Sequence, residues 1–232
     1  MSSIQDTSQL FHPLVPASKE VARLNGTLWA KSILARTFYR AIELAAVTLA
    51  HAGISADTIT YLSLVFAVLA GVCVGFGHLG LAAGLVLLSG SLDLVDGALA
   101  RTTGSASRWG ALLDSTLDRV ADAAPLVGVV VFYANWHWAA LAPLVAIVAG
   151  FVISYVRART EALGQKLPSL FMRRAERVLL IAGSLALGTI SLDSVIDAPL
   201  MLAGVALSSV LNVVGAVTIL AAARVALNAN AG

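Results

Sequence analysis

Long apolar segments separated by short polar connections dominate the chain after residue 52. They cover residues 58–77, 80–100, 108–133, 137–157, 178–195 and 198–222. Each has about the 20 residues that a helix needs to cross the hydrocarbon core of a bilayer. Residues 1–30 form a polar N-terminal arm without the apolar stretch of a signal peptide. The pattern predicts an all-α, polytopic membrane protein with six transmembrane helices in a domain of residues 53–232.

Residues 31–52 differ from these segments because charged side chains interrupt their apolar positions. The charged residues are Lys31, Arg36, Arg40 and Glu43. A helix with one charged and one apolar face lies in the plane of the membrane surface. We therefore expect an amphipathic surface helix ahead of the first span.

Composition supports the membrane class. Of 232 residues, 59% are hydrophobic and 12% are charged, and the mean hydropathy is +0.88, whereas a soluble domain has about 25% charged residues. The single cysteine, Cys73, excludes an intrachain disulfide. We expect the lipid bilayer, and no nucleic acid, as the surroundings of this chain.

Basic residues alternate between the connections. The first, third and fifth connections contain no Lys or Arg, and the second contains Arg101 and Arg108. The N-terminal arm and surface helix together carry five, and the C-terminal end carries Arg224. The fourth connection carries six: Arg157, Arg159, Lys166, Arg173, Arg174 and Arg177. Because basic connections stay in the cytoplasm, both termini are predicted to be cytoplasmic, with the protein in the cell (cytoplasmic) membrane.

Five aspartates lie within residues 91–122, where an isolated charge is costly in a membrane. Asp93 and Asp96 are three positions apart in the second apolar segment, and Asp114 and Asp118 are four apart in the third. Residues three or four apart share one face of a helix. Two neighbouring helices could therefore bring four carboxylates to one place.

Two kinds of partner could compensate these carboxylates. One is the set of nearby arginines, namely Arg101, Arg108 and Arg119. The other is one or two divalent cations, Mg²⁺ or Mn²⁺, which prefer oxygen ligands. Zinc is disfavoured because the cluster contains no Cys or His. Gly97 and Gly110 lie beside the two pairs, where a missing side chain lets a ligand approach closely.

The run D-x2-D-G-x2-A-R-x8-G-x3-D-x3-D extends from Asp93 to Asp118. It matches the signature of the CDP-alcohol phosphotransferases, and the chain resembles this family from about residue 31. The resemblance implies that Asp93, Asp96, Asp114 and Asp118 hold two divalent ions against the pyrophosphate of a CDP-linked lipid. It also implies that Asp118 is the general base on an acceptor hydroxyl, with CMP as the leaving group.

The same resemblance implies a nucleotide site. The stretch GISADTIT is similar to a family element that carries a proline where this chain has Ala56. The residues assigned to the CDP-lipid are Asp57, Thr60, Gly97, Arg101 and Gly110. The fifth aspartate, Asp122, is interpreted as an outer neighbour of the metal ligands or as a partner of Arg119.

The fourth connection bears on the acceptor alcohol. SYVRAR-x-E-A-x-G followed by R-x-E-R resembles the branch of phosphatidylinositol-phosphate and archaetidylinositol-phosphate synthases. This resemblance implies a phosphorylated acceptor, inositol 1-phosphate, whose phosphate is bound by Arg157, Arg159, Arg177 and Arg224. Since Arg173 and Arg174 are adjacent, at most one of them should face this pocket.

Three alternatives stay open. The basic residues could serve only the orientation of the chain in the membrane. The acceptor could be glycerol 3-phosphate, which needs a cationic pocket too. The chain could be a cation transporter, which would spread its carboxylates across the membrane. The family resemblance further implies CDP-diacylglycerol or CDP-archaeol as donor, and a homodimer.

Overall fold

The computed structural model describes residues 33–168 and 171–229, which contain helices and no strand. The side chains of residues 33–36 are outside this description, as is the predicted N-terminal arm. The helices are α2 (Ile33–His51), α3 (Ala56–Gly75), α4 (Leu79–Thr102), α5 (Arg108–Phe132), α6 (Leu141–Ala162), α7 (Arg174–Leu187) and α8 (Pro199–Asn228). The predicted all-α class is confirmed.

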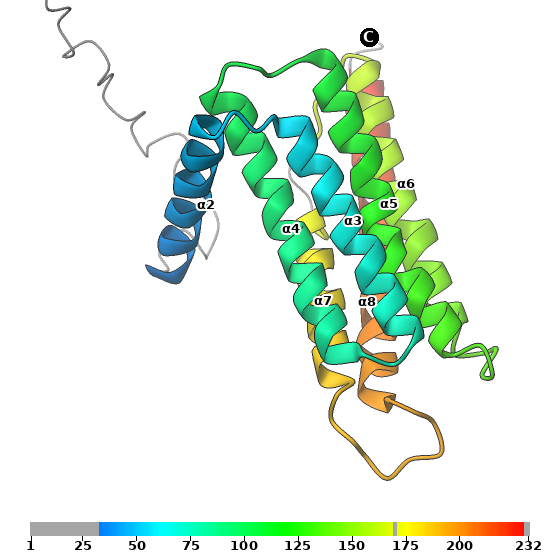
Figure 1. The fold of residues 1–232 in the computed structure, drawn as a ribbon. Helices are drawn as coiled ribbons and strands as arrows, with labels where there is room; N and C mark the ends of the chain where they lie inside the picture. The colour runs from blue at the N-terminus through cyan, green and yellow to red at the C-terminus, as the bar shows by residue number, and fades with distance from the viewer. Residues whose placement is uncertain (1–32, 169–170, 230–232) are drawn as a thin grey trace, which may run out of the picture.

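Helices α3 to α8 form one bundle, and α2 lies beside it next to α4 (Figure 1). The connections after α2, α4 and α6 lie towards the end of the bundle where the chain terminates, and those after α3, α5 and α7 lie at the opposite end (Figure 1). The basic connections predicted from the sequence therefore all lie towards the first of these ends, here called the basic end.

Helix ends follow from local side-chain chemistry. Ser55 and Ser107 cap α3 and α5, because their hydroxyls accept hydrogen bonds from the amides of Thr58 at 3.2 Å and Gly110 at 2.9 Å. The turn between α3 and α4 uses a left-handed residue, Gly77, with φ of 79°. Short polar connections therefore suffice to reverse the chain between antiparallel neighbours.

Four helices are long and apolar enough to span a membrane: α3, α4, α6 and α8. The chain is accordingly a multi-pass membrane protein. Helix α5 has the length but carries the charged residues Asp114, Asp118, Arg119 and Asp122. Helix α7 has 14 residues, or about 21 Å at 1.5 Å per residue, less than the roughly 30 Å of a hydrocarbon core.

The bounds of α7 differ from the predicted segment 178–195. The helix begins at Arg174 and ends at Leu187. The apolar residues Ile190, Leu192 and Val195 kept the hydropathy high beyond that end, but they lie exposed in the connection to α8. At its N-terminal end, α7 begins deeper in the bundle than the start of α3 and the end of α4, which lie at the basic end (Figure 1).

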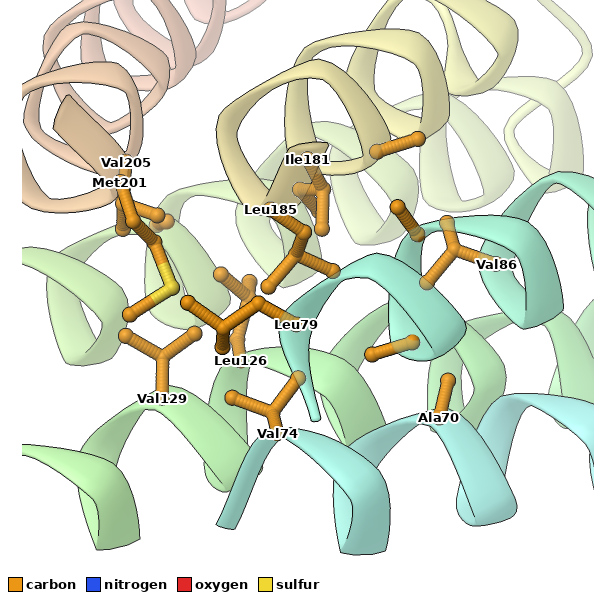
Figure 2. Close-up of a cluster of buried hydrophobic side chains, with 14 of the residues drawn as sticks. Ala70, Val74, Leu79, Val86, Leu126, Val129, Ile181, Leu185, Met201 and Val205 are labelled. Carbon is orange, nitrogen blue, oxygen red and sulfur yellow. The ribbon is translucent and has the colours of Figure 1, made fainter. Parts of the chain in front are cut away.

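An apolar core fills the half of the bundle away from the basic end. Figure 2 shows side chains of this core, among them Val74, Leu126, Leu185 and Met201, which come from four different helices of the cluster's six. Leu185, near the C-terminal end of α7, is fully buried in this cluster. The core therefore fixes α7 by its far end relative to α3, α4, α5 and α8.

Helices α3 and α5 cross without side chains between them. A β-carbon at Gly71 would collide with the carbonyl of Ala124, and one at Gly128 would collide with the backbone of Gly71. Helix α3 also binds α4, since Ser63 and Ser89 each donate a hydroxyl proton to the other's carbonyl, at 3.0 and 2.9 Å. These contacts fix α3 against both helices that carry the predicted metal ligands.

We expect Gly128→Ala to destabilise the protein, because the added methyl meets backbone that cannot rotate away. Overpacking of this kind costs about 1–3 kcal/mol, which corresponds to a fall in Tm of roughly 2–10 °C. The measurement is a thermal unfolding scan of the detergent-solubilised protein. Gly84→Ala is the matched control, because a β-carbon at Gly84 has no atom within 4 Å. Equal Tm values for the two variants would contradict the tight crossing.

Candidate metal and substrate site

Three carboxylates converge between α4 and α5. One oxygen from each of Asp93, Asp114 and Asp118 lies within 4.8 Å of the others. All three side chains are partly buried. Like charges at this separation, away from bulk water, require a compensating positive charge.

Arg174, the first residue of α7, supplies positive charge to this cluster. Its NH1 contacts the carboxylates of Asp93 and Asp118, the latter at 2.9 Å, and its Nε lies 3.1 Å from Asp122 Oδ1. The partners expected from the sequence are three arginines nearer in the chain, Arg101, Arg108 and Arg119, and Arg174 is not among them. Arg174 reaches the cluster because α7 begins within the bundle, a feature that no local pattern encodes.

The prediction that at most one of Arg173 and Arg174 faces the site agrees with the structure. Arg173 lies just before α7 and is bound to Glu176, whose carboxylate accepts from the Arg173 amide at 2.9 Å. This contact caps the helix. The adjacent Arg174 is thereby directed to the opposite side, towards α4 and α5.

The residues present fit a divalent cation. All three groups offer hard carboxylate oxygens. Two ligands of one Mg²⁺, each at about 2.1 Å, lie at most about 4.2 Å apart, so a separation within 4.8 Å needs only small side-chain rotations. The Arg174 guanidinium between Asp93 and Asp118 also shows that this position accepts a cation.

Asp96 has a different environment from the other predicted ligands. It is 4% exposed, and its Oδ2 lies 2.7 Å from the hydroxyl of Thr60, which also lies 3.1 Å from the carbonyl of Ala56. Asp96 is therefore connected to α3, while Asp93, Asp114 and Asp118 face one another. Its role as a metal ligand stays a prediction.

The other residues predicted to bind nucleotide lie close to this cluster. A β-carbon at Gly97 would lie 3.2 Å from NH1 of Arg101, and one at Gly110 would lie 3.5 Å from Oδ1 of Asp57. The two glycines thus leave room for charged side chains from their surroundings. The structure brings the start of α3, the end of α4 and the start of α5 together, as the predicted nucleotide site requires.

The predicted acceptor arginines differ in their surroundings. Arg177 is 7% exposed and donates from NH2 to Asp122 at 2.7 Å and from NH1 to the carbonyl of Met172 at 3.1 Å. Arg157 donates to the carbonyl of Pro168 at 3.4 Å. Arg159 and Arg224 are exposed near the C-terminal ends of α6 and α8. All four therefore lie on elements of the basic end, but the structure buries only Arg177.

Asp122 binds the arginines of α7. The interpretation as a partner of Arg119 considered only its neighbours in the chain, whereas Arg174 and Arg177 are 52 and 55 residues away. One signal was available: Arg174 and Arg177 are three positions apart and share a helix face, so they can meet a single carboxylate on an adjacent helix.

A small cavity of about 20 Å³ adjoins Asp122 between α5, α6, α7 and α8. Its lining includes Arg119, Asp122, Ser154, Arg177 and Asn212. Asn212 is 2% exposed, and its Oδ1 has no hydrogen-bond partner within the described part of the chain. Buried polar atoms are normally paired. The cavity therefore offers a hydrogen-bond acceptor to a bound water.

Comparisons with known proteins place this geometry among lipid-synthesising enzymes. Residues 53–210 match the family model described as CDP-alcohol phosphatidyltransferase. The phosphatidylinositol phosphate synthase of Mycobacteroides abscessus is 36% identical over 158 residues, which cover 66% of this chain and 71% of the relative. The archaetidylinositol phosphate synthase of Methanothermobacter thermautotrophicus is 39% identical over 132 residues, which cover 56% of this chain and 66% of the relative.

Two crystal structures of the phosphatidylinositol phosphate synthase of Mycobacterium tuberculosis are similar to this chain in fold. The structure with CDP-DAG bound has a TM-score of 0.69 at 29% identity and covers 79% of this chain and 94% of that chain. The structure in complex with manganese and citrate has a TM-score of 0.70 at 29% identity, covering 79% and 88%.

We expect Asp114→Asn to weaken Mn²⁺ binding, because the substitution removes one of the three converging charges. Substitution of residues that hydrogen-bond to metal ligands lowers metal affinity by about 10–100-fold. For a ligand itself, we therefore expect the Mn²⁺ affinity to fall by at least about 10-fold. Electron paramagnetic resonance titration of Mn²⁺ into the purified protein measures it. Asp193→Asn, in the exposed connection after α7, is the control. An unchanged affinity in Asp114→Asn would exclude Asp114 as a ligand.

Proposed function

Because the chain belongs to the CDP-alcohol phosphatidyltransferase family, we propose that it joins inositol 1-phosphate to the phosphatidyl group of CDP-diacylglycerol, or to the archaetidyl group of CDP-archaeol, and releases CMP. The observation that carries the proposal is the contact between the aspartate cluster and α7. Arg174 and Arg177 place two guanidinium groups next to Asp118 and Asp122. The names of the relatives from Mycobacteroides and Methanothermobacter support the choice of acceptor.

The aspartate cluster would hold the divalent ions, Mg²⁺ or Mn²⁺. Asp93, Asp114 and Asp118 already converge, and Asp96 completes the set proposed from the signature. When bound, two such ions neutralise pyrophosphate charge and stabilise the attacking and leaving oxygens. The manganese complex of the Mycobacterium tuberculosis enzyme supports this assignment.

Asp118 would take the proton of the acceptor hydroxyl. The freed oxygen then attacks the lipid-side phosphorus, the bond from that phosphorus to the oxygen of CMP breaks, and CMP leaves with the electron pair. The proposed nucleotide contacts orient the CDP-lipid for this in-line displacement; they are Asp57, Thr60, Gly97, Arg101 and Gly110. The missing side chains of Gly97 and Gly110 leave room for Arg101 and Asp57, which supports placing these nucleotide contacts together.

The acceptor phosphate would bind the arginines of the basic end. Arg157, Arg159, Arg177 and Arg224 are the proposed contacts, and Arg guanidinium groups suit phosphate because they bind it through two donors at once. A cation transporter is not favoured, because the acidic residues of α4 and α5 converge on one place.

The membrane arrangement proposed from the sequence extends the four apolar helices to six spans. Helices α5 and α7 pack among the four candidate spans, which supports their position within the membrane. Helix α2 would lie on the cytoplasmic surface, with residues 1–30 as a cytoplasmic arm and residues 53–232 as the catalytic domain. Both termini would be cytoplasmic, and the protein would form a homodimer.

An acceptor assay tests the proposed activity directly. Purified protein with Mg²⁺ and CDP-diacylglycerol is incubated with labelled inositol 1-phosphate or labelled glycerol 3-phosphate, and lipid products are separated. We expect labelled lipid and CMP with inositol 1-phosphate. Product only with glycerol 3-phosphate would replace the proposed acceptor, and absence of product with both would contradict the proposed reaction.

Asp118→Asn should reduce turnover by about 10²–10⁴-fold, the usual contribution of a general base. Binding of the CDP-lipid should largely persist, because nucleotide contacts lie on α3, α4 and the start of α5. Single-turnover kinetics measure the first effect, and binding of labelled CDP-diacylglycerol measures the second. Wild-type turnover in this variant would remove Asp118 from the mechanism.

A further inference from the structure

Asp122 binds two arginines with its two oxygens. Arg174 donates from Nε to Oδ1 at 3.1 Å, and Arg177 donates from NH2 to Oδ2 at 2.7 Å. The two arginines occupy successive turns of α7, and Asp122 lies one turn beyond Asp118 in α5. Asp122 does not belong to the three carboxylates that converge within 4.8 Å. Its contacts therefore indicate a role separate from metal binding.

The second contact of Arg177 fixes its guanidinium plane. NH1 donates to the carbonyl of Met172 at 3.1 Å. Met172 is 1% exposed and has a left-handed backbone with φ of 61°, which is uncommon for a residue other than glycine. Two anchors on different segments, Asp122 and the Met172 carbonyl, thus determine the direction of the Arg177 side chain.

The remaining edge of Arg177 faces the small cavity beside Asp122. Its Nε takes part in neither of those contacts and would lie 3.8 Å from a β-carbon at Gly150. Gly150 lines the same cavity as Ser154 and Asn212. With Asp122 in place, one donor of Arg177 is therefore left for a ligand other than Asp122 and the Met172 carbonyl.

Charge favours the same role. Once divalent ions compensate Asp93, Asp114 and Asp118, the two guanidinium groups of Arg174 and Arg177 face the single negative charge of Asp122, so this group keeps one excess positive charge for an anionic ligand. Arg174 is also the side chain that reaches Asp93 and Asp118. A carboxylate that orients both arginines without neutralising them is suited to prepare a phosphate site next to the reacting groups.

We propose that Asp122 is a positioning residue, which holds Arg174 and Arg177 in the orientation that binds the phosphate of the acceptor alcohol. The proposal rests on the proposed function in requiring a phosphorylated acceptor, but not on which alcohol carries the phosphate. It gives Asp122 no contact with substrate and no share in proton transfer. Its effect should therefore appear in acceptor binding rather than in the binding of the CDP-lipid.

The test compares Asp122→Asn and Asp122→Glu with the wild type. Steady-state kinetics give the KM for inositol 1-phosphate, the KM for CDP-diacylglycerol and kcat. Asp122→Asn removes the charge that both arginines bind, so its acceptor KM should rise by about 10-fold or more, while its donor KM should change less than about 3-fold. Asp122→Glu restores the charge and should give an acceptor KM between those of wild type and Asp122→Asn.

Two controls separate positioning from general stability. Asp193→Asn removes a carboxylate from the exposed connection after α7 and should leave all constants unchanged. In an Arg177→Gln background, Asp122→Asn should raise the acceptor KM much less than in the wild type, because part of its effect acts through Arg177. A merely structural role would lower Tm and the active fraction, and would leave both KM values at the wild-type level.

The outcomes are distinguishable. An acceptor KM in Asp122→Asn equal to that of wild type overturns the positioning role even if inositol 1-phosphate is the acceptor. If wild type uses glycerol 3-phosphate instead, the acceptor assignment fails and the same kinetics are run with that alcohol. If Asp122→Asn does not fold, Asp122→Glu decides: a raised acceptor KM with unchanged donor KM supports the role, and an unchanged acceptor KM overturns it.

Discussion

Compensation of negative charge inside an apolar bundle is the constraint on which this structure depends. Asp93, Asp114 and Asp118 converge where water is scarce, and like charges there repel strongly unless cations lie between them. The cationic side chain bound to them in the structure is Arg174, from a helix more than 50 residues farther along the chain than these aspartates. The position of α7 and its end at Leu187 are consistent with this requirement. So is Asp122, the carboxylate that binds the Arg174 guanidinium next to these aspartates.

The two halves of the bundle consequently differ in chemistry and in packing. Away from the basic end, apolar side chains of six helices fill the core, and α3 crosses α5 at backbone contact. Towards the basic end, the apolar clusters are smaller, and hydrogen bonds and ion pairs accompany them, from Thr60 and Asp96 to Asp122 and Arg177.

The parts that the sequence predicts are those with local causes. The convergence of Asp114 with Asp118 follows from their helical spacing, and the predicted segments 58–77 and 80–100 agree with the bounds of α3 and α4 to within two residues. The family signature adds Arg101 to Gly97 and Gly110, and the structure places Gly97 next to Arg101 and Gly110 next to Asp57. Within this region, the chain's local pattern and its three-dimensional arrangement agree.

The parts that the sequence does not predict depend on contacts between distant residues. Arg174 and Asp122 are 52 positions apart, and no spacing rule relates them. Hydropathy also misplaced α7, because exposed apolar residues follow its C-terminal end while polar residues at its N-terminal end lie inside the bundle. The separate surroundings of Asp96 likewise depend on Thr60, which lies 36 residues earlier on another helix.

The shortness of α7 has a consequence for the evolution of this fold. Leu185 and its neighbours anchor the far end of the helix in the apolar core (Figure 2), so the number of residues between that anchor and Arg174 determines the depth at which the guanidinium lies. One additional helical turn would displace Arg174 by about 5.4 Å, beyond the roughly 4 Å over which an ion pair forms. Insertions and deletions in this short helix should therefore be tolerated far less than changes of its lipid-facing side chains.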